Sequence, residues 1–389
     1  MASGIRFSTK LIHGHGFFDE ATGAFIPPIY QTAIFEQPDR RTGETRLTDR
    51  GTELKYSREE NPTVRALERT LAALEEADDA LAFSSGMAAI STTYVALLKR
   101  GSRLVVPAQA YGTTIQLATE LTKFGVKIAK VWPSTDSIIE AVRTGDVVLV
   151  ETITNPTLRV IDVPAVAKRC REVGATLVVD NTFASPVIYR PLADGADLVI
   201  ESLTKYIAGH NDVVGGCIAG PSESIAQLWE WRRRMGSIAH PFDAFLTLRG
   251  LKTLEVRFER QSRTALEIAE FLEDHPLVEE VMYPGLSSSP YKELADRMFI
   301  KKLYGGVVSF KVKGGRSKAL RVLSRVHVIR PSPSLGGTES LLTYPVISAA
   351  KTIPEEDRKK LGITEGLLRL SVGLEDPEDL KEDLATALS

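Results

Sequence analysis

Two stretches decide the fold of this chain: ATLVVDN at residues 175–181 and LVIESLTK at residues 198–205. Each contains a run of apolar, mostly β-branched residues that ends in polar side chains. Because these runs do not alternate apolar with polar residues, they are typical of strands buried on both faces of a parallel sheet. Similar runs lie at 103–106 and 147–150. Four such strands predict a parallel sheet at the centre of the chain.

Helical patterns separate these strands, at residues 113–123, 137–143 and 165–172. Strand and helix in alternation indicate an open α/β sheet with helices on its faces. We therefore expect a large, mostly parallel α/β domain over residues 61–250.

The two flanks differ from this centre. Residues 1–60 lack periodicity and contain several prolines, which predicts an extended arm or an interface segment. Residues 251–389 are expected to form a smaller C-terminal α+β domain, entered by one long helix over 245–275. Its other elements are expected to be strands at 306–312, 326–329 and 368–372 and helices at 317–323 and 377–388.

Composition excludes several classes of protein. The 389 residues are 43% hydrophobic and 25% charged, and a net charge of -2 favours neither a nucleic-acid nor a membrane partner. Cys170 and Cys217 are the only cysteines, so we expect no disulfide framework and a reducing, cytoplasmic location. No apolar run reaches the roughly 18 residues of a membrane helix. His13 and His15 lack neighbouring Cys or carboxylate ligands, so no metal site is predicted.

Chemically distinct side chains follow the four predicted strands. In open α/β sheets, ligands bind beyond the carboxyl ends of the strands. In strand order, the side chains there are Tyr111, then Glu151 and Asn155, then Asp180, then Ser202, Thr204 and Lys205. A ring, an amide, carboxylates, two hydroxyls and an amine should thus meet at one edge of the sheet, which predicts a binding site.

Pyridoxal phosphate (PLP) is a cofactor that uses all of these groups. Lys205 offers the amine for a Schiff base, and Asp180 offers a carboxylate that keeps the pyridine nitrogen protonated. Tyr111 can stack on the ring. Ser202 and Thr204 are two residues apart, so in an extended segment their hydroxyls face the same side.

The phosphate has a predicted binding site as well. Gly86 and Met87 open a predicted helix, whose free backbone N–H groups suit an anion. Each residue alone has an ordinary structural interpretation, because a lone lysine after a strand is usually solvated and a lone aspartate usually caps a turn or helix. The order and convergence of Lys205, Asp180 and Gly86 favour the cofactor site.

Seven motifs spread along the chain support this interpretation: YSR at 56–58, NPT at 61–63, SGMAAI at 85–90, VVDNT at 178–182, SLTKY at 202–206, SLGG at 334–337 and RLSVG at 369–373. With them the chain resembles, nearly end to end, the Cys/Met-metabolism family of PLP enzymes. Its members include cystathionine γ-synthase, cystathionine γ-lyase, cystathionine β-lyase and methionine γ-lyase. The resemblance implies fold type I of the PLP-dependent transferases, with a large open sheet domain and a smaller C-terminal domain.

The resemblance also implies roles for further residues. Tyr56 and Arg58 would bind the phosphate of the adjacent subunit's cofactor, so the N-terminal arm would contact the neighbouring subunit. The assembly would be a homotetramer of two active dimers. Arg369 would bind the α-carboxylate of an amino-acid substrate, helped by Asn155 and the backbone at Ser340.

Two residues would carry the reaction. Lys205 would act as the general base that moves protons, and Tyr111 would assist at the γ-leaving group. The expected outcome is γ-elimination, or γ-replacement by a thiol.

Specificity depends on fewer signals. Glu339 can bind the distal amino group of cysteine or cystathionine, as in the γ-synthases and γ-lyases. Thr113 counts against a methionine γ-lyase, which has cysteine at that position. Lys55 and Gln116 replace an acid and an arginine that the family often carries, so recognition of the distal end should be altered.

We therefore expect a transsulfuration enzyme with small amino-acid substrates. The favoured activity is cystathionine γ-synthase, which joins an O-acyl-homoserine and cysteine to form cystathionine. Cystathionine γ-lyase is the alternative, and methionine γ-lyase is less favoured. A cofactor-binding regulator without turnover is disfavoured by the intact set of Lys205, Asp180, Tyr111 and Arg369.

Overall fold

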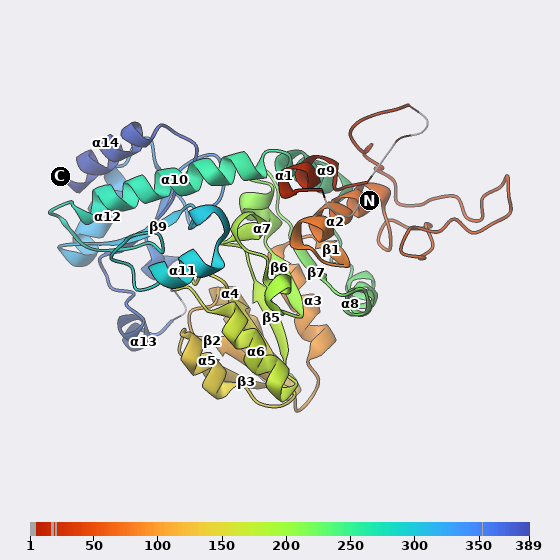
Figure 1. The fold of residues 1–389 in the computed structure, drawn as a ribbon, viewed down its shortest axis with the longest axis horizontal. Helices are drawn as coiled ribbons and strands as arrows, with labels where there is room; N and C mark the ends of the chain where they lie inside the picture. Colours follow the sequence, from red (N-terminus) through yellow and green to blue (C-terminus); the bar gives the residue numbers. More distant parts are fainter. Residues whose placement is uncertain (1–4, 17–18, 20–21, 352) are drawn as a thin grey trace.

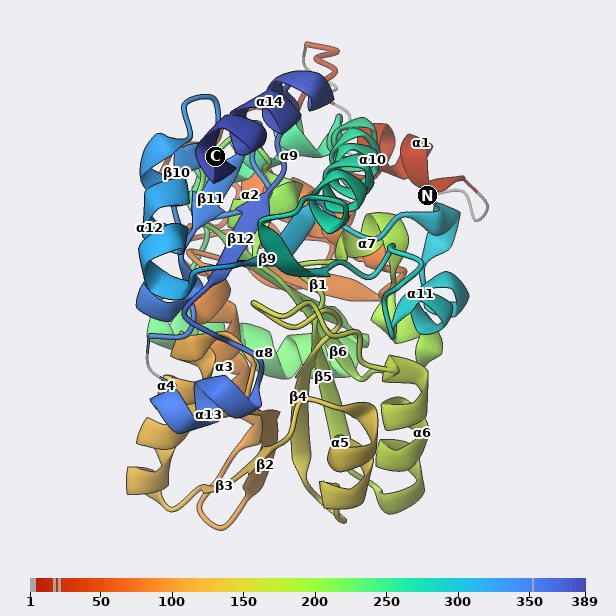
Figure 2. The same ribbon diagram turned by 90° about the vertical axis from the view of Figure 1, so that its left-hand side faces the viewer.

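The computed structural model describes residues 5–16, 19, 22–351 and 353–389 (Figures 1 and 2). Its large sheet contains seven strands in the order β1-β7-β6-β5-β4-β2-β3. β7 runs antiparallel to both of its neighbours, and the pairs from β6 to β3 are parallel. The predicted mostly parallel α/β sheet is confirmed. The strands are β1 (Asp79–Phe83), β2 (Arg103–Pro107), β3 (Lys127–Val131), β4 (Val147–Glu151), β5 (Thr176–Asp180), β6 (Leu198–Glu201) and β7 (Gly216–Gly220).

Helices cover both faces of this sheet, as Figure 2 shows. Leu104 and Val105 are adjacent in β2, point to opposite faces, and are both 0% exposed in two different apolar clusters. Burial on both faces is the reason that the strands lack polar alternation. The helices of this domain are α2 (Pro62–Glu75), α3 (Gly86–Leu97), α4 (Gly112–Glu120), α5 (Thr135–Ala141), α6 (Val163–Val173), α7 (Ser185–Ile188) and α8 (Ser222–Met235).

A second, smaller sheet follows in the C-terminal part, with the order β10-β11-β12-β9-β8. Its strands are β8 (Val278–Met282), β9 (Val307–Val312), β10 (Arg330–Pro331), β11 (Leu341–Thr343) and β12 (Leu367–Ser371). The helices here are α10 (Leu254–Glu273), α11 (Lys292–Met298), α12 (Gly315–Arg325), α13 (Glu355–Lys360) and α14 (Pro377–Leu388). α9 (Pro241–Leu251) precedes them and packs against α2 of the large domain. The exact boundary between the two domains stays a prediction.

Two predicted elements in this region are wrong. The single helix over 245–275 is two helices, because Arg257 and Thr253 donate hydrogen bonds to the carbonyl of Gly250, at 2.9 and 3.2 Å, where α9 ends. The strand predicted at 326–329 is absent, because the Asp383 carboxylate accepts the backbone N–H groups of residues 327–329 that a strand partner would need.

The N-terminal segment leaves the body of the molecule after α1 (Phe7–His13) and loops outward before α2 (Figure 1). Arg50 fixes its return, with ion pairs to Asp79, Glu68 and Glu60 at 2.7, 3.0 and 3.1 Å. Farther out, apolar side chains face solvent, including Phe25 at 94% exposure.

No helix in the described residues is both long and apolar enough to cross a membrane. Cys170 and Cys217 are buried, and neither forms a disulfide.

Two buried carboxyl groups meet between α2 and β6. Glu75 and Glu201 end these elements, and each is 1% exposed. Burial raises the pKa of both carboxyl groups, and the charge of Glu75 raises that of Glu201 further. The amide of Asn181 donates to Glu201 at 3.1 Å. The pair therefore holds a proton at neutral pH.

Glu75→Gln should make stability less dependent on pH. A carboxyl whose pKa is higher in the folded state takes up a proton on folding, so stability falls as pH rises from about 4.3, the unfolded value. The loss continues up to the folded pKa of Glu75, which burial raises to about 8. For one proton, the variant should reduce the pH dependence of the free energy of unfolding by at most about 1.4 kcal/mol per pH unit.

Urea midpoints between pH 5 and pH 8, at one protein concentration, measure this slope. Glu76→Gln is the control, since the neighbouring Glu76 side chain is 47% exposed and should leave the slope as in the wild type. If the urea midpoints of the wild type and Glu75→Gln change with pH in parallel, Glu75 takes up no proton on folding and the prediction is wrong.

Candidate active site

A cavity of about 260 Å³ lies at the carboxyl ends of β4, β5 and β6. The parallel register creates it, because Glu151 pairs with Asp180 and Asp180 with Ile200, so the three strands end side by side. The residues predicted for the site that line the cavity are Gly86, Met87, Tyr111, Asn155, Asp180, Ser202, Thr204, Lys205 and Arg369.

Lys205 lies at a break in the backbone, in the π-helical turn Leu203–Ile207, where its own φ of -90° and ψ of -126° are not helical. Its Nζ donates to Ser334 Oγ at 3.0 Å, and it forms no ion pair with a carboxylate in the described chain. Burial and the charge of Arg369 lower the pKa of Lys205 to about 8. The neutral amine, which is the form that attacks an aldehyde, is therefore accessible near neutral pH.

Asp180 is held by a threonine two residues later. Thr182 donates its backbone N–H and its hydroxyl to Asp180 Oδ1, at 3.1 and 2.6 Å. The same hydroxyl accepts the backbone N–H of Ser202 at 2.9 Å, which ties the ends of β5 and β6 together. Burial raises the pKa of Asp180, and the bonds from Thr182 oppose this. A cation such as a protonated ring nitrogen would stabilise the charged carboxylate.

The start of α3 forms the other end of the cavity. Ser85 caps this helix, and Gly86 and Met87 lie in its first turn, where backbone N–H groups have no intrahelical acceptor. A Cβ at Gly86 would lie 3.2 Å from Ser202 Cβ, and one at Gly216 would lie 2.2 Å from the Ser85 carbonyl oxygen. Glycines are therefore needed for this close approach, which suits a phosphate.

Tyr111 and Thr204 are placed by backbone contacts. Tyr111 precedes α4, is 46% exposed, and donates its backbone N–H to Glu151 Oε1 at 2.5 Å. Thr204 accepts the backbone N–H of Gly215 on its hydroxyl at 3.0 Å.

Arg369 is a buried cation without a carboxylate. It is 2% exposed, and Nη1 donates to Asn155 Oδ1 at 2.9 Å. Nη2 donates to the carbonyls of Pro333 and Ser334, at 2.7 and 3.0 Å, and Nε has no partner in the described chain. Burial lowers the pKa of Arg369 to about 10. An unpaired guanidinium in a cavity wall is costly unless an anion binds to it.

Three residues of the site have no assigned task in the sequence analysis. Glu151 is among the strand-end residues and Thr182 ends the VVDNT motif, but their contacts could not be read from those patterns. Ser334 opens the SLGG motif, and its contact with Lys205 joins residues 129 positions apart.

Four predicted residues do not line this cavity. Tyr56 is 39% exposed, and Arg58 donates to the carbonyl of Arg233 on α8. Glu339 lies on the surface, and the Ser340 N–H is donated to Glu375 at 2.6 Å. Their roles stay predictions.

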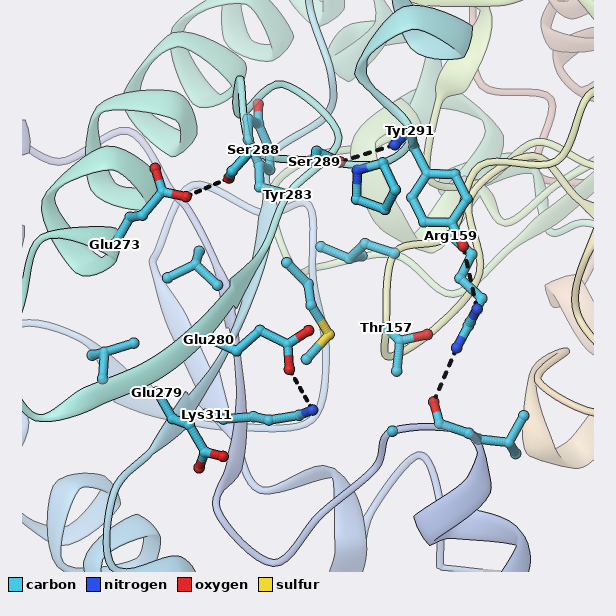
Figure 3. A pocket seen from close by; sticks show the side chains of 17 residues that line it. Thr157, Arg159, Glu273, Glu279, Glu280, Tyr283, Ser288, Ser289, Tyr291 and Lys311 are labelled. Atoms are coloured by element: carbon cyan, nitrogen blue, oxygen red, sulfur yellow. Dashed lines mark hydrogen bonds and ion pairs between the residues drawn. The ribbon is translucent and has the colours of Figure 1, made fainter.

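A second cavity, of about 430 Å³, lies between β8 and the loop after β4 (Figure 3). Its one lysine, Lys311, is paired with Glu280 at 2.5 Å, and Arg159 donates to Tyr291 and to the Leu361 carbonyl. Since an aldehyde cofactor needs an unpaired amine, the cavity at Lys205 is the candidate active site.

Comparison with known proteins agrees with this geometry. The profile of the family described as Cys/Met metabolism PLP-dependent enzyme matches residues 8–389. The chain belongs to this family. It is 42% identical to the cystathionine γ-lyase of Dictyostelium discoideum over 98% of this chain and 97% of that protein. It is also 42% identical to the cystathionine γ-synthase of Mycobacterium bovis, over 98% and 96%.

A solved structure shows the same fold. The structure of cystathionine γ-synthase from Xanthomonas oryzae pv. oryzae in complex with aminoacrylate and cysteine matches with a TM-score of 0.92. It is 37% identical, and the match covers 99% of this chain and 98% of that one. Fold type I and dependence on PLP follow from the family and this likeness.

The cavity of this PLP enzyme fits the cofactor. Lys205 is an amine with no carboxylate partner among the described residues, Asp180 is a buried carboxyl group whose charged form a cation would stabilise, and Gly86 opens a helix where a Cβ would crowd Ser202. The amine would react with the cofactor's aldehyde, the carboxylate would bind its pyridinium, and the start of the helix would bind its phosphate.

The lowered pKa of Lys205 predicts how cofactor-free protein reacts. Trace acetylation of its lysines, followed by mass spectrometry from pH 6.5 to pH 10.5, should show half-maximal reactivity of Lys205 near the pKa of about 8. Ordinary lysines titrate near about 10.4 and serve as internal controls. A Lys205 midpoint among those ordinary lysines would show that burial and Arg369 do not act on its amine.

Proposed function

We propose that this PLP enzyme is a cystathionine γ-synthase. The reaction breaks the bond between Cγ of an O-acyl-homoserine and its acyloxy oxygen, forms a bond from Cγ to the sulfur of cysteine, and releases the carboxylic acid. The observation that carries the general chemistry is the unpaired Arg369 guanidinium, which faces the same cavity as Lys205.

Each residue of the cavity then has a task. Arg369, already held by Asn155, binds the α-carboxylate and so places Cα near Lys205. Lys205 removes the α-proton and moves protons between carbon atoms, with Ser334 as the hydrogen-bond partner of its Nζ. Tyr111, at the open side of the cavity, assists at the leaving group. The bound cofactor supplies the electron sink for negative charge at Cα.

Glu339 supports an amino-acid thiol as the second substrate. It follows Gly336 by three residues, and a Cβ at Gly336 would lie only 2.7 Å from the Tyr206 nitrogen, beside Lys205. The Glu339 carboxylate accepts hydrogen bonds from Thr338 and Asn211, at 2.9 and 2.6 Å, and these bonds lower its pKa. An ionised carboxylate on the loop that passes beside Lys205 at Gly336 can pair with the ammonium of cysteine.

Cystathionine γ-lyase is the second candidate, because the γ-lyase and γ-synthase relatives are equally similar, at 42% identity each. Glu339 would then bind the distal ammonium of cystathionine. Lys55 is paired with Glu53 at 2.6 Å, and Gln116 is uncharged, so neither adds a free charge for a distal carboxylate. Incubation with O-succinyl- or O-acetyl-homoserine plus cysteine, against cystathionine alone, separates the candidates by product: cystathionine or 2-oxobutyrate.

Glu339→Ala should raise the KM for cysteine about tenfold. The variant loses one charge-assisted hydrogen bond, and a loss of about 1.4 kcal/mol corresponds to a tenfold change in affinity. Elimination from O-acyl-homoserine alone should change much less, since that substrate has no second amino group. Glu382→Gln is the control, because Glu382 lies on the exposed face of α14. Glu375→Gln is not suitable, because Glu375 accepts a hydrogen bond from the backbone of Ser340. Equal losses in both reactions would make Glu339 structural.

We further propose that the N-terminal arm completes the cavity of a neighbouring protomer within a cytoplasmic homotetramer. The cations that line the cavity are Lys205 and Arg369, which are assigned to the aldehyde and the α-carboxylate, so none lining it is left for the phosphate. Arg58 is stacked on Tyr56, with its guanidinium carbon 5.2 Å from the ring centroid, on an arm with exposed apolar side chains. A second protomer would bury these side chains and receive Arg58 at its phosphate site.

Mixing two inactive variants tests this assembly. Arg58→Ala should lose cofactor, and Lys205→Ala should lose activity. In a hybrid dimer, one site combines an intact Lys205 with an intact Arg58 from the other protomer. Random exchange of protomers should therefore restore about a quarter of the wild-type sites. Arg41→Ala, on the same arm, is the control and should retain cofactor. No recovery on mixing would place Arg58 in the site of its own chain.

A further inference from the structure

Glu151 is an acidic residue of the cavity to which the reaction above gives no task. It is the last residue of β4, it is 7% exposed, and it lines the same cavity as Lys205. Its Oε1 accepts the backbone N–H of Tyr111 at 2.5 Å. Its Oε2 is buried and has no hydrogen-bond partner in the described chain.

The register of the sheet places a second carboxyl group beside it. Glu151 pairs with Asp180 across β4 and β5, so both side chains leave the sheet on the same face. Asp180 Oδ1 is supplied with two hydrogen bonds by Thr182. In the part of the chain that the structure describes, Glu151 accepts one hydrogen bond, from the backbone N–H of Tyr111. Of the two carboxyl groups, Asp180 therefore receives more hydrogen bonds that stabilise a negative charge.

The other groups near Glu151 do not offset a negative charge. Tyr94 of α3 faces both carboxyl groups, and its buried hydroxyl also lacks a partner in the described residues. Lys205 and Arg369 line the cavity but form hydrogen bonds with Ser334 and Asn155. Burial and the charge of Asp180 raise the pKa of Glu151. Two adjacent buried carboxyl groups favour one negative charge over two.

We propose that Glu151 is a positioning residue of the cofactor site that remains a neutral carboxylic acid. Its Oε1 holds the backbone of Tyr111 in place, and its buried Oε2 carries the proton. The single negative charge beside the cofactor then belongs to Asp180. This inference rests on the cofactor cavity described above, and not on the choice between synthase and lyase.

Two variants separate a neutral acid from a carboxylate. Glu151→Gln keeps the shape, the acceptor for Tyr111 and a donor, and loses only the capacity to ionise. Glu151→Ala loses all of these. We expect Glu151→Gln to bind PLP within about threefold of the wild type and Glu151→Ala to bind about tenfold more weakly, as for one lost hydrogen bond. Equilibrium dialysis measures both. Glu120→Gln, on the exposed end of α4, is the matched control.

A spectroscopic measurement makes the test independent of turnover. In cofactor-free protein with ¹³C-labelled glutamate, the infrared difference between wild type and Glu151→Gln at neutral pH should contain the C=O band of a protonated carboxyl group. The control variant should show only the loss of a carboxylate band. If the lost band is that of a carboxylate, or if Glu151→Gln binds PLP as weakly as Glu151→Ala, the proposal is overturned.

If Glu151→Ala does not fold, the infrared comparison of the wild type with Glu151→Gln still tests the proposal. Borohydride reduction of each folded variant, with the label mapped to Lys205, shows independently that the cofactor occupies this cavity. A protein that carries the label on Lys205 but makes no cystathionine would refute the proposed synthase activity and leave the role of Glu151 standing.

Discussion

The active site depends on the parallel register of β4, β5 and β6. Glu151, Asp180 and the segment after Glu201 reach one edge of the sheet because these strands run in the same direction and their ends are aligned. Thr182 then bonds to both Asp180 and Ser202, so the loops beyond the strands are tied together as well. A shift of one residue would turn each side chain to the opposite face. The apolar runs buried on both faces oppose such a shift.

Incomplete pairing of buried charges gives this site its reactivity. Lys205 has a lowered pKa because it is buried near Arg369 without a carboxylate. Arg369 is held by one amide and two carbonyls, none of which neutralises it. Arg50, by comparison, has three acidic partners, whereas the buried Arg257, outside the cavity, is bonded to backbone carbonyls and to Thr253. What distinguishes Lys205 and Arg369 is that they line one cavity, where a bound anion or aldehyde can reach them.

Chemistry and specificity occupy different parts of the fold. Lys205, which would move protons, lies in the turn after β6, and Arg369, which would bind the α-carboxylate, lies in the middle of β12 of the second sheet. Glu339, Lys55 and Gln116 lie on the surface, in loops or on an exposed helix face. If these outer residues select the distal group, as proposed above, one fold can serve relatives with different names, such as the γ-lyase and the γ-synthase that are each 42% identical to this chain.

The sequence alone determined the central sheet and the cofactor and predicted the lysine, because these depend on local patterns: unbroken apolar runs, the glycine at the start of α3, and polar residues at strand ends. It could not reveal the break between α9 and α10 or the missing strand at 326–329, which Arg257 and Asp383 impose from distant positions. Nor could it show that Glu151 lies beside Asp180 with an unpartnered oxygen, or that Asn155 contacts Arg369 across 214 residues. Only the tertiary structure decided these pairings, because hydrogen bonds and charge burial act through space and leave no periodicity along the chain.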